Sequence, residues 1–158
     1  QGDEVTLCLA EDRATFAVGN ATLSTSLLQV EFPNYRQLIQ PSYPNTLTVA
    51  REALLEAVRR CRIFARETTP VRLEMTATSL KLSVITQDIG NSEEEIDCSL
   101  EGTEMTVGFN PEYLAAGIEA VTGDEITIQT TDPQRPAVLR GVGAEDYLYL
   151  VMPQRLTV

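Results

Sequence analysis

The order of predicted elements repeats once along the chain, and this repetition limits the possible folds more than any other feature. Residues 45–50 alternate as a strand, and residues 51–66 are strong helix formers without Gly or Pro. Three further strands are predicted at residues 70–76, 79–86 and 93–99, with a Gly-Asn turn before the last. One unit therefore reads strand–helix–strand–strand–strand.

The second unit follows directly and has the same order. A strand at residues 105–109 leads into Asn110, a good N-cap, and Pro111, a residue favoured at the first helical position. This helix runs to about residue 121, and Gly123 marks its end. The remaining strands are predicted at residues 125–131, 136–142 and 146–152. Two such units predict an α+β domain with antiparallel sheets and both helices on one side.

The first part of the chain has strands only. They are predicted at residues 4–9, 13–18 and 22–28, and Gly19-Asn20 suits a tight hairpin turn. Prolines 33, 41 and 44 mark a connector, so we place a domain boundary at about residue 42. Three strands bury little surface. We therefore expect residues 1–42 to be the tail of a preceding unit, residues 43–158 to be a whole domain, and the chain to be a fragment.

Composition excludes several kinds of chemistry. The 158 residues contain no His, which rules out Ser–His–Asp and Cys–His nucleophiles and His-containing zinc sites. Cys8, Cys61 and Cys98 are far apart, which favours free thiols in a reducing compartment. No apolar run approaches the ~20 residues of a membrane span, and the N-terminus lacks a secretion signal. We expect a cytoplasmic protein.

Basic charge is concentrated in one segment of an acidic chain. The net charge is −11, yet residues 51–72 hold six arginines against three glutamates. On a helical wheel Arg59, Arg62 and Arg66 share one face. That face is either a solvated surface or a sequence-independent phosphate-binding surface, and the spacing leaves both open.

Two other features have no obvious role in a core. Ile63 lies on the side of the helix where a polar residue is expected, and Phe64 follows it. These two residues could form an assembly contact. The acidic run Glu93-Glu94-Glu95 is either a solvated edge strand or a charged rim for a basic partner.

Three motifs, in order along the chain, resemble bacterial DNA sliding clamps, the beta subunits of DNA polymerase III. They are FPNYRQLI at residues 32–39, GFNPEYL at 108–114 and YLYLVMPQRL at 147–156. The resemblance covers essentially the whole chain, as the end of the second clamp domain followed by the third. It implies a non-catalytic processivity factor, without cofactor or metal, that pairs head to tail into a homodimeric ring. Helices would line the hole, and antiparallel sheets would lie outside.

The resemblance also implies partners and residue roles. Duplex DNA would pass through the full ring, near Arg59, Arg62 and Arg66. Ile63, Phe64 and Glu93, Glu94 and Glu95 would lie at the subunit interface. The replicative polymerase, the clamp loader and repair polymerases would dock through linear peptides in a hydrophobic pocket. Its residues would be Pro33, Leu38, Asn110, Tyr113, Gln134, Pro136, Leu150, Met152, Pro153, Gln154 and Arg155. Gln154 and Gln134 depart from the family's more apolar pattern.

Two alternatives stay open. A stand-alone adaptor or decoy would bind the same peptides without encircling DNA. An enzyme lacking His would need paired carboxylates or a metal held by Asp and Glu, for which Glu93–Glu95 is the one candidate cluster. Adjacent strand residues point to opposite faces, which disfavours the enzyme.

Overall fold

The structure is a computed structural model that describes residues 4–66, 68–87, 89–144 and 147–156, and it divides into two compact units. The first unit spans Gln1–Tyr35 and the second spans Arg36–Val158. Neither helix in the described ranges is long and apolar enough to cross a membrane. The two units are described separately.

The N-terminal unit is a three-stranded antiparallel meander of β1 (Val5–Leu9), β2 (Arg13–Val18) and β3 (Ala21–Ser26). Val18 pairs with Ala21, so Gly19-Asn20 forms the predicted two-residue turn, and Gly19 has the positive φ of 55° that such a turn requires. The register places Leu7 opposite Phe16 and Phe16 opposite Leu23. One face of this sheet is therefore apolar.

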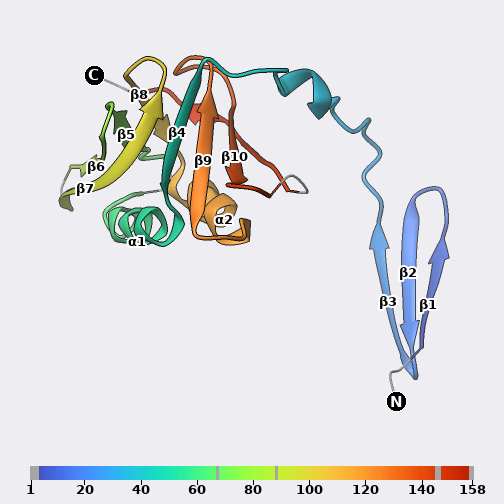
Figure 1. Ribbon diagram of the computed structural model, residues 1–158. Coiled ribbons are helices and arrows are strands. Elements are labelled where there is room, and N and C mark those ends of the chain that lie inside the picture. Colours follow the sequence, from blue (N-terminus) through green and yellow to red (C-terminus); the bar gives the residue numbers. More distant parts are fainter. Residues whose placement is uncertain (1–3, 67, 88, 145–146, 157–158) are drawn as a thin grey trace. The chain divides into compact units, whose positions relative to one another are not determined.

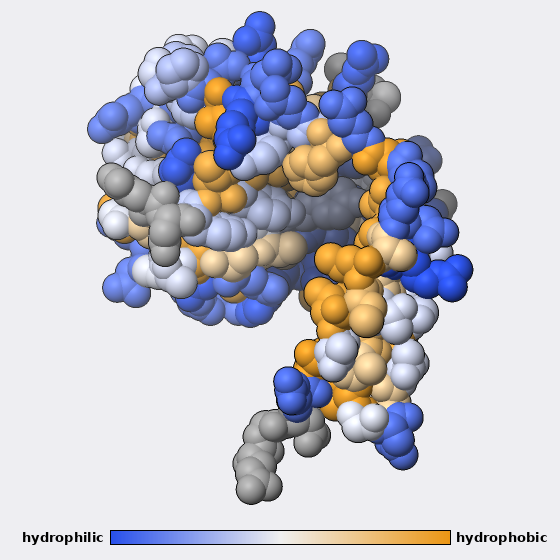
Figure 2. All heavy atoms as spheres, turned by 90° about the vertical axis from the view of Figure 1, so that its right-hand side faces the viewer, coloured by the Kyte–Doolittle hydropathy of each residue, from blue (hydrophilic) through white to orange (hydrophobic). Residues whose placement is uncertain are grey.

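That apolar face is exposed within the unit (Figure 2). Among its described residues, Ala14 is the one apolar side chain that is buried. A sheet that buries so little has a weak core of its own. The assignment of residues 1–42 to a preceding domain stays a prediction.

The C-terminal unit contains the predicted repeat. After a 3₁₀ turn at Tyr35–Leu38, the first copy consists of β4 (Asn45–Ala50), α1 (Arg51–Arg62), β5 (Val71–Met75), β6 (Ser79–Thr86) and β7 (Gly90–Glu101). The second consists of β8 (Met105–Phe109), α2 (Pro111–Ala120), β9 (Glu125–Thr130), β10 (Ala137–Gly141), β11 (Tyr149–Val151) and β12 (Pro153–Gln154). The strand–helix–three-strand duplication is confirmed.

Strand pairing follows the same internal symmetry. All pairs are antiparallel, in the order β11-β10-β9-β4-β7-β6-β5-β8-β12. The first strand of each copy pairs with the second strand of the other copy, as β4 with β9 and β8 with β5. Strand β7 pairs with β6 through residues 90–97 and then with β4 through residues 98–101. Strands β11 and β12, separated by Met152, likewise pair with β10 and then with β8.

Both helices lie side by side under one face of this sheet (Figure 1). Helix α1 buries Leu54, Leu55, Ala57, Val58 and Cys61. Helix α2 buries Leu114 and Ile118. It approaches β11 closely at Gly117, where a Cβ would lie 2.4 Å from the Tyr149 ring. The α+β architecture predicted from the sequence is confirmed.

Some predicted boundaries are wrong. Helix α1 ends at Arg62, because the backbone N–H groups of Ile63 and Phe64 bond three residues back in a tightened last turn. Ala65 and Arg66 therefore lie beyond the helix. Gly90 and Asn91, predicted as a turn, are the first residues of β7. The last predicted strand, residues 146–152, begins outside the described residues, and its described part forms only β11 at Tyr149–Val151, with β12 following at Pro153–Gln154.

Candidate functional site

The turn between β9 and β10, residues 131–136, contributes side chains to two surface hollows. The smaller, of about 240 Å³, is lined by Gln37, Leu38, Gln40, Thr131, Arg135 and Pro136. The larger, of about 610 Å³, is lined by Thr106, Val107, Gly108, Pro133, Gln134, Pro153, Gln154, Arg155 and Leu156. Leu38 and Pro136 thus come together in one hollow, and Gln134, Pro153, Gln154 and Arg155 in the other. Residues 37–40, 106–108 and 153–156 thus meet at this turn.

The turn is held in shape by two side chains that the sequence motifs did not identify. Asp132 Oδ1 accepts hydrogen bonds from the backbone N–H groups of Gln134 (2.8 Å) and Arg135 (3.1 Å). Asn45 Nδ2 donates to the carbonyl oxygens of Thr130 and Thr131, both at 3.2 Å. The Asp-Pro pair at residues 132–133 is a turn signal that could have predicted the first of these contacts. The bonds fix the turn before any ligand binds.

The C-terminal segment forms the opposite wall of the larger hollow. Pro153 and Gln154 pair with Phe109 and Gly108 of β8. A Cβ at Gly108 would lie 2.7 Å from the Leu156 side chain, so this position suits glycine. Gln154 Oε1 is buried without a hydrogen-bond partner among the described residues. A buried carbonyl of this kind favours a ligand that supplies an N–H group.

The other residues predicted for the pocket lie elsewhere. Pro33 belongs to the N-terminal unit. Leu150 is half-buried on β11, while Met152 is 58% exposed between β11 and β12. Asn110 caps α2, because its Oδ1 accepts from the N–H groups of Glu112 and Tyr113. The predicted cap is confirmed. Tyr113, Leu150 and Met152 line neither of the two hollows.

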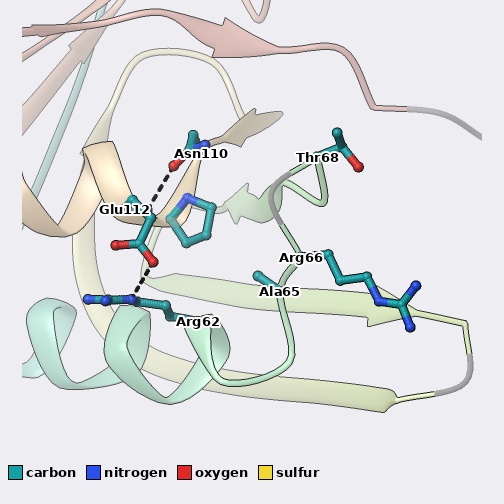
Figure 3. Close-up of a pocket in the computed structure, with 7 residues that line it drawn as sticks. Arg62, Ala65, Arg66, Thr68, Asn110 and Glu112 are labelled. Carbon is teal, nitrogen blue, oxygen red and sulfur yellow. Dashed lines mark hydrogen bonds and ion pairs between the residues drawn. The ribbon is translucent and has the colours of Figure 1, made fainter.

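A third hollow, of about 620 Å³, lies between the end of α1 and the start of α2 (Figure 3). Asn110 lines it together with Arg62, Ala65, Arg66, Thr68, Pro111 and Glu112. Arg62 Nε lies 2.6 Å from Glu112 Oε1, while the Arg66 side chain extends away from that carboxylate. Arg66 makes no ion pair with the residues that the structure describes. Two of the three arginines predicted to face DNA thus share a hollow.

Arg59 lies further back on α1 and is also paired. Its guanidinium contacts Glu119 of α2 at 3.0 Å and Glu56 at 3.2 Å. Hydrogen bonds to these carboxylates, that to Glu119 first, raise the pKa of Arg59 above its ordinary value. The predicted common helical face holds for Arg59 and Arg62. It is wrong for Arg66, because α1 has already ended.

The residues predicted for the subunit interface differ in exposure. Ile63 is 75% exposed, whereas Phe64 is partly buried against the core and its carbonyl accepts from Thr86 Oγ1 at 2.6 Å. Along β7, Glu93 and Glu95 are exposed and Glu94 is half-buried. Glu93 pairs with Lys81 of β6 at 2.9 Å.

Glu94 points instead toward α1. Its two carboxylate oxygens accept from Arg60 Nε at 2.8 Å and Arg60 Nη2 at 3.0 Å. This bidentate contact lowers the pKa of Glu94 and is only partly opposed by burial. The three adjacent carboxylates therefore face alternate sides of the strand, and the described residues contain no group of three possible metal ligands. A shared acid–base or metal site at Glu93–Glu95 has no support from this arrangement.

The Glu94–Arg60 pair predicts a pH-dependent stability. Because the pKa of Glu94 is lower in the folded chain, the pair stabilises the fold above the unfolded pKa of about 4.3. That contribution is lost as the pH falls through the folded pKa. Urea unfolding of the wild type and Glu94→Gln from pH 7 downward should show a small stability gap that closes in acid. A gap that widens in acid would contradict this assignment.

The cysteines are free thiols. Cys61 is buried in the core and Cys98 is half-buried, and burial raises the pKa of both thiols. A raised pKa lowers the fraction of reactive thiolate. The environments of Cys61 and Cys98 therefore match small apolar residues, as the sequence predicted, whereas Cys8 is exposed on β1.

Comparison with known proteins gives one family. The chain is 30% identical to the beta sliding clamp of Streptomyces coelicolor and 31% identical to that of Synechococcus elongatus, over 99% of its length. It spans 44% and 43% of those relatives. Among solved structures, a sliding clamp of Bartonella birtlesii bound to griselimycin superposes with a TM-score of 0.82 at 27% identity, over 96% of this chain and 41% of that one.

The Caulobacter crescentus polymerase III beta subunit gives a TM-score of 0.81 at 25% identity. Beta sliding clamps are non-catalytic processivity factors. The family model described as the C-terminal domain of the DNA polymerase III beta subunit matches residues 36–155, more than half of the sequence. The chain therefore belongs to the DNA polymerase III beta subunit family, the bacterial sliding clamps, and corresponds to its C-terminal portion.

Proposed function

We propose that this chain acts as the docking part of a cytoplasmic sliding clamp, which tethers polymerases and other partners to duplex DNA without catalysis. The observation that supports a docking role is the turn at residues 131–136 and the two hollows beside it. It joins an apolar hollow with Leu38 and Pro136 to a more polar hollow with Gln134 and Gln154. Short linear peptides commonly bind in such grooves through apolar anchors, with polar contacts fixing their register.

The chemistry of the two hollows indicates how a peptide would lie. An aliphatic or aromatic anchor suits Leu38 and Pro136. A backbone or side-chain N–H group would satisfy the buried Gln154 Oε1. Arg155 is exposed and lines the same hollow, so it can contact a peptide carbonyl or carboxylate. Ile63, Glu93 and Glu95 would remain exposed on this chain for contact with another subunit.

We expect a labelled peptide copied from the clamp-binding segment of a bacterial replicative polymerase to bind this chain. Fluorescence anisotropy should give saturable binding with a Kd in the micromolar range, about −8 kcal/mol. Griselimycin, the ligand of the Bartonella clamp, should compete if the two ligands share the hollows. A folded chain that binds neither ligand would contradict the docking role.

The DNA part of the proposal concerns the helical layer. Arg59, Arg62 and Arg66 lie on or just after α1. Arginine forks match phosphate oxygens, and a clamp that slides needs contacts that read no sequence. We propose that these three arginines contact the DNA backbone. Binding should weaken as salt rises, because each phosphate contact releases counterions.

A further inference from the structure

Two arginines of α1 that we propose to face DNA are already engaged by carboxylates of α2. Arg59 pairs with Glu119 at 3.0 Å, and Arg62 pairs with Glu112 at 2.6 Å. Glu112 is in the first turn of α2 and Glu119 is near its end, so the pairs are two turns apart. Helix α2 has no Lys or Arg of its own. The acidic helix therefore offsets the basic one along their contact.

These pairs contribute little to the fold. The side chains of Arg59 and Glu119 are 45% and 48% exposed, and those of Arg62 and Glu112 are 48% and 56% exposed. Ion pairs with that much solvent access add little net stability, since water screens them and ordering the side chains costs entropy. The apolar contacts of Leu54, Val58, Leu114 and Ile118 already hold α1 and α2 in the core. The ion pairs are therefore not needed to hold the helices together and can serve another role.

A carboxylate and a phosphate offer an arginine the same kind of partner. Both are oxygen anions that accept hydrogen bonds from the guanidinium fork. A DNA phosphate that approaches Arg59 or Arg62 must compete with a glutamate already in contact. Arg66 presents no such competitor among the described residues, and Figure 3 shows its side chain directed away from Glu112.

We propose that Glu112 and Glu119 are internal competitors for DNA phosphate, which weaken the hold of the helical layer on duplex DNA. They keep Arg59 and Arg62 extended and ordered while the chain is free. A passing phosphate then exchanges with a carboxylate, and the carboxylate recaptures the arginine when the phosphate leaves. Weak, exchangeable contacts of this kind suit a protein that must move along DNA. The inference rests on the proposed DNA contact and adds the residues that limit its strength.

The test measures duplex binding when the competitors are neutralised. A fluorescein-labelled 20-base-pair duplex is titrated with the wild type, Glu112→Gln, Glu119→Gln and the double variant, at several salt concentrations. Each single variant should bind about two- to fivefold more tightly at low salt, the range that exposed pairs allow. The slope of log K against log salt should steepen by up to about 0.9 in Glu112→Gln, and by less in Glu119→Gln, where Glu56 still contacts Arg59 at 3.2 Å.

Glu74→Gln is the matched control. Glu74 pairs with Arg72 at 3.2 Å on β5, so this change also removes one negative charge and frees one arginine. Arg72 and Glu74 alternate with buried residues of β5 and face away from the core that the helices cover. An increase in duplex affinity greater than that of Glu74→Gln therefore measures the effect of removing the Glu112 or Glu119 pair, apart from the loss of one negative charge. Urea unfolding checks the fold of each variant, which should unfold at the same urea midpoint as the wild type.

The outcomes separate this inference from the DNA role itself. A double variant that binds no more tightly than Glu74→Gln overturns the inference, while loss of binding in Arg66→Ala still supports DNA contact. Binding by the double variant where the wild type binds undetectably supports the inference, because the glutamates then mask the surface. Failure of every variant to bind at low salt overturns both proposals.

Discussion

Truncating Leu38 and Met152 together should reduce affinity for the polymerase peptide by about two orders of magnitude. Leu38 lines the apolar hollow beside Pro136. Met152 lines neither hollow, but it is exposed directly before Pro153 in the wall of the larger one, where a peptide that extends past this wall would cover it. Each change to alanine removes an apolar surface that a bound anchor would cover, worth about 1.5 kcal/mol. A combined loss of about 3 kcal/mol corresponds to the expected rise in Kd.

The fold should survive this double substitution. Leu38 is 43% exposed and Met152 is 58% exposed, so neither contributes much to the core. Ile85→Ala is the matched control, since Ile85 is an exposed aliphatic residue on β6 that lines neither hollow and, unlike Met152, is not next in sequence to a residue that does. An unchanged Kd in Leu38→Ala/Met152→Ala, with the control also unchanged, would exclude these side chains as anchors. Circular dichroism checks that both variants are folded.

Most of the fold was predictable because it depends on local patterns that occur twice. Period-2 alternation predicts β5 and β6, and the Asn110-Pro111 start predicts α2 almost to the residue. The end of α1 was not predictable in the same way. Residues 63–66 have good helix propensity, but the chain must leave α1 to reach β5, and this tertiary requirement overrides propensity. Arg66 therefore lies beyond the end of α1 and not on the predicted helical face.

The candidate site was predictable in part. Motif resemblance identified Leu38, Pro136, Gln134 and residues 153–155, and the structure brings these into two hollows beside one turn, whereas Tyr113, Leu150 and Met152 line neither hollow. Resemblance could not identify Asn45, because a single Asn at the start of a strand has no sequence signature for contacts 85 residues away. The Glu112 and Glu119 pairs also depend on how α1 and α2 pack. Counting charges along the sequence identified a basic segment. Only the packing of the helices showed that carboxylates of α2 offset the charges of Arg59 and Arg62 in that segment.

Replacing Asn45 with alanine should destabilise the C-terminal unit by about 2–4 kcal/mol. Asn45 is 4% exposed and makes three hydrogen bonds, two from Nδ2 to the carbonyls of Thr130 and Thr131 and one to Oδ1 from the Thr103 N–H at 2.8 Å. Alanine leaves these backbone groups without their partner. Each buried polar group left unsatisfied costs about 1–3 kcal/mol, less where water can reach it. Urea unfolding gives the difference, and Asn91→Ala on the exposed start of β7 is the control.

The same substitution should also weaken peptide binding in the chains that remain folded. Thr131 lines the hollow with Leu38 and begins the turn that carries Gln134 and Pro136. Loss of the Asn45 bonds frees that turn at its β9 end, whereas Asp132 still holds its centre. A looser turn must be ordered when a peptide binds, and that ordering costs affinity. Peptide titration at low temperature, where Asn45→Ala is fully folded, should therefore give a higher Kd than the wild type. An equal Kd with reduced stability would restrict Asn45 to the fold and show that Asp132 alone preforms the turn.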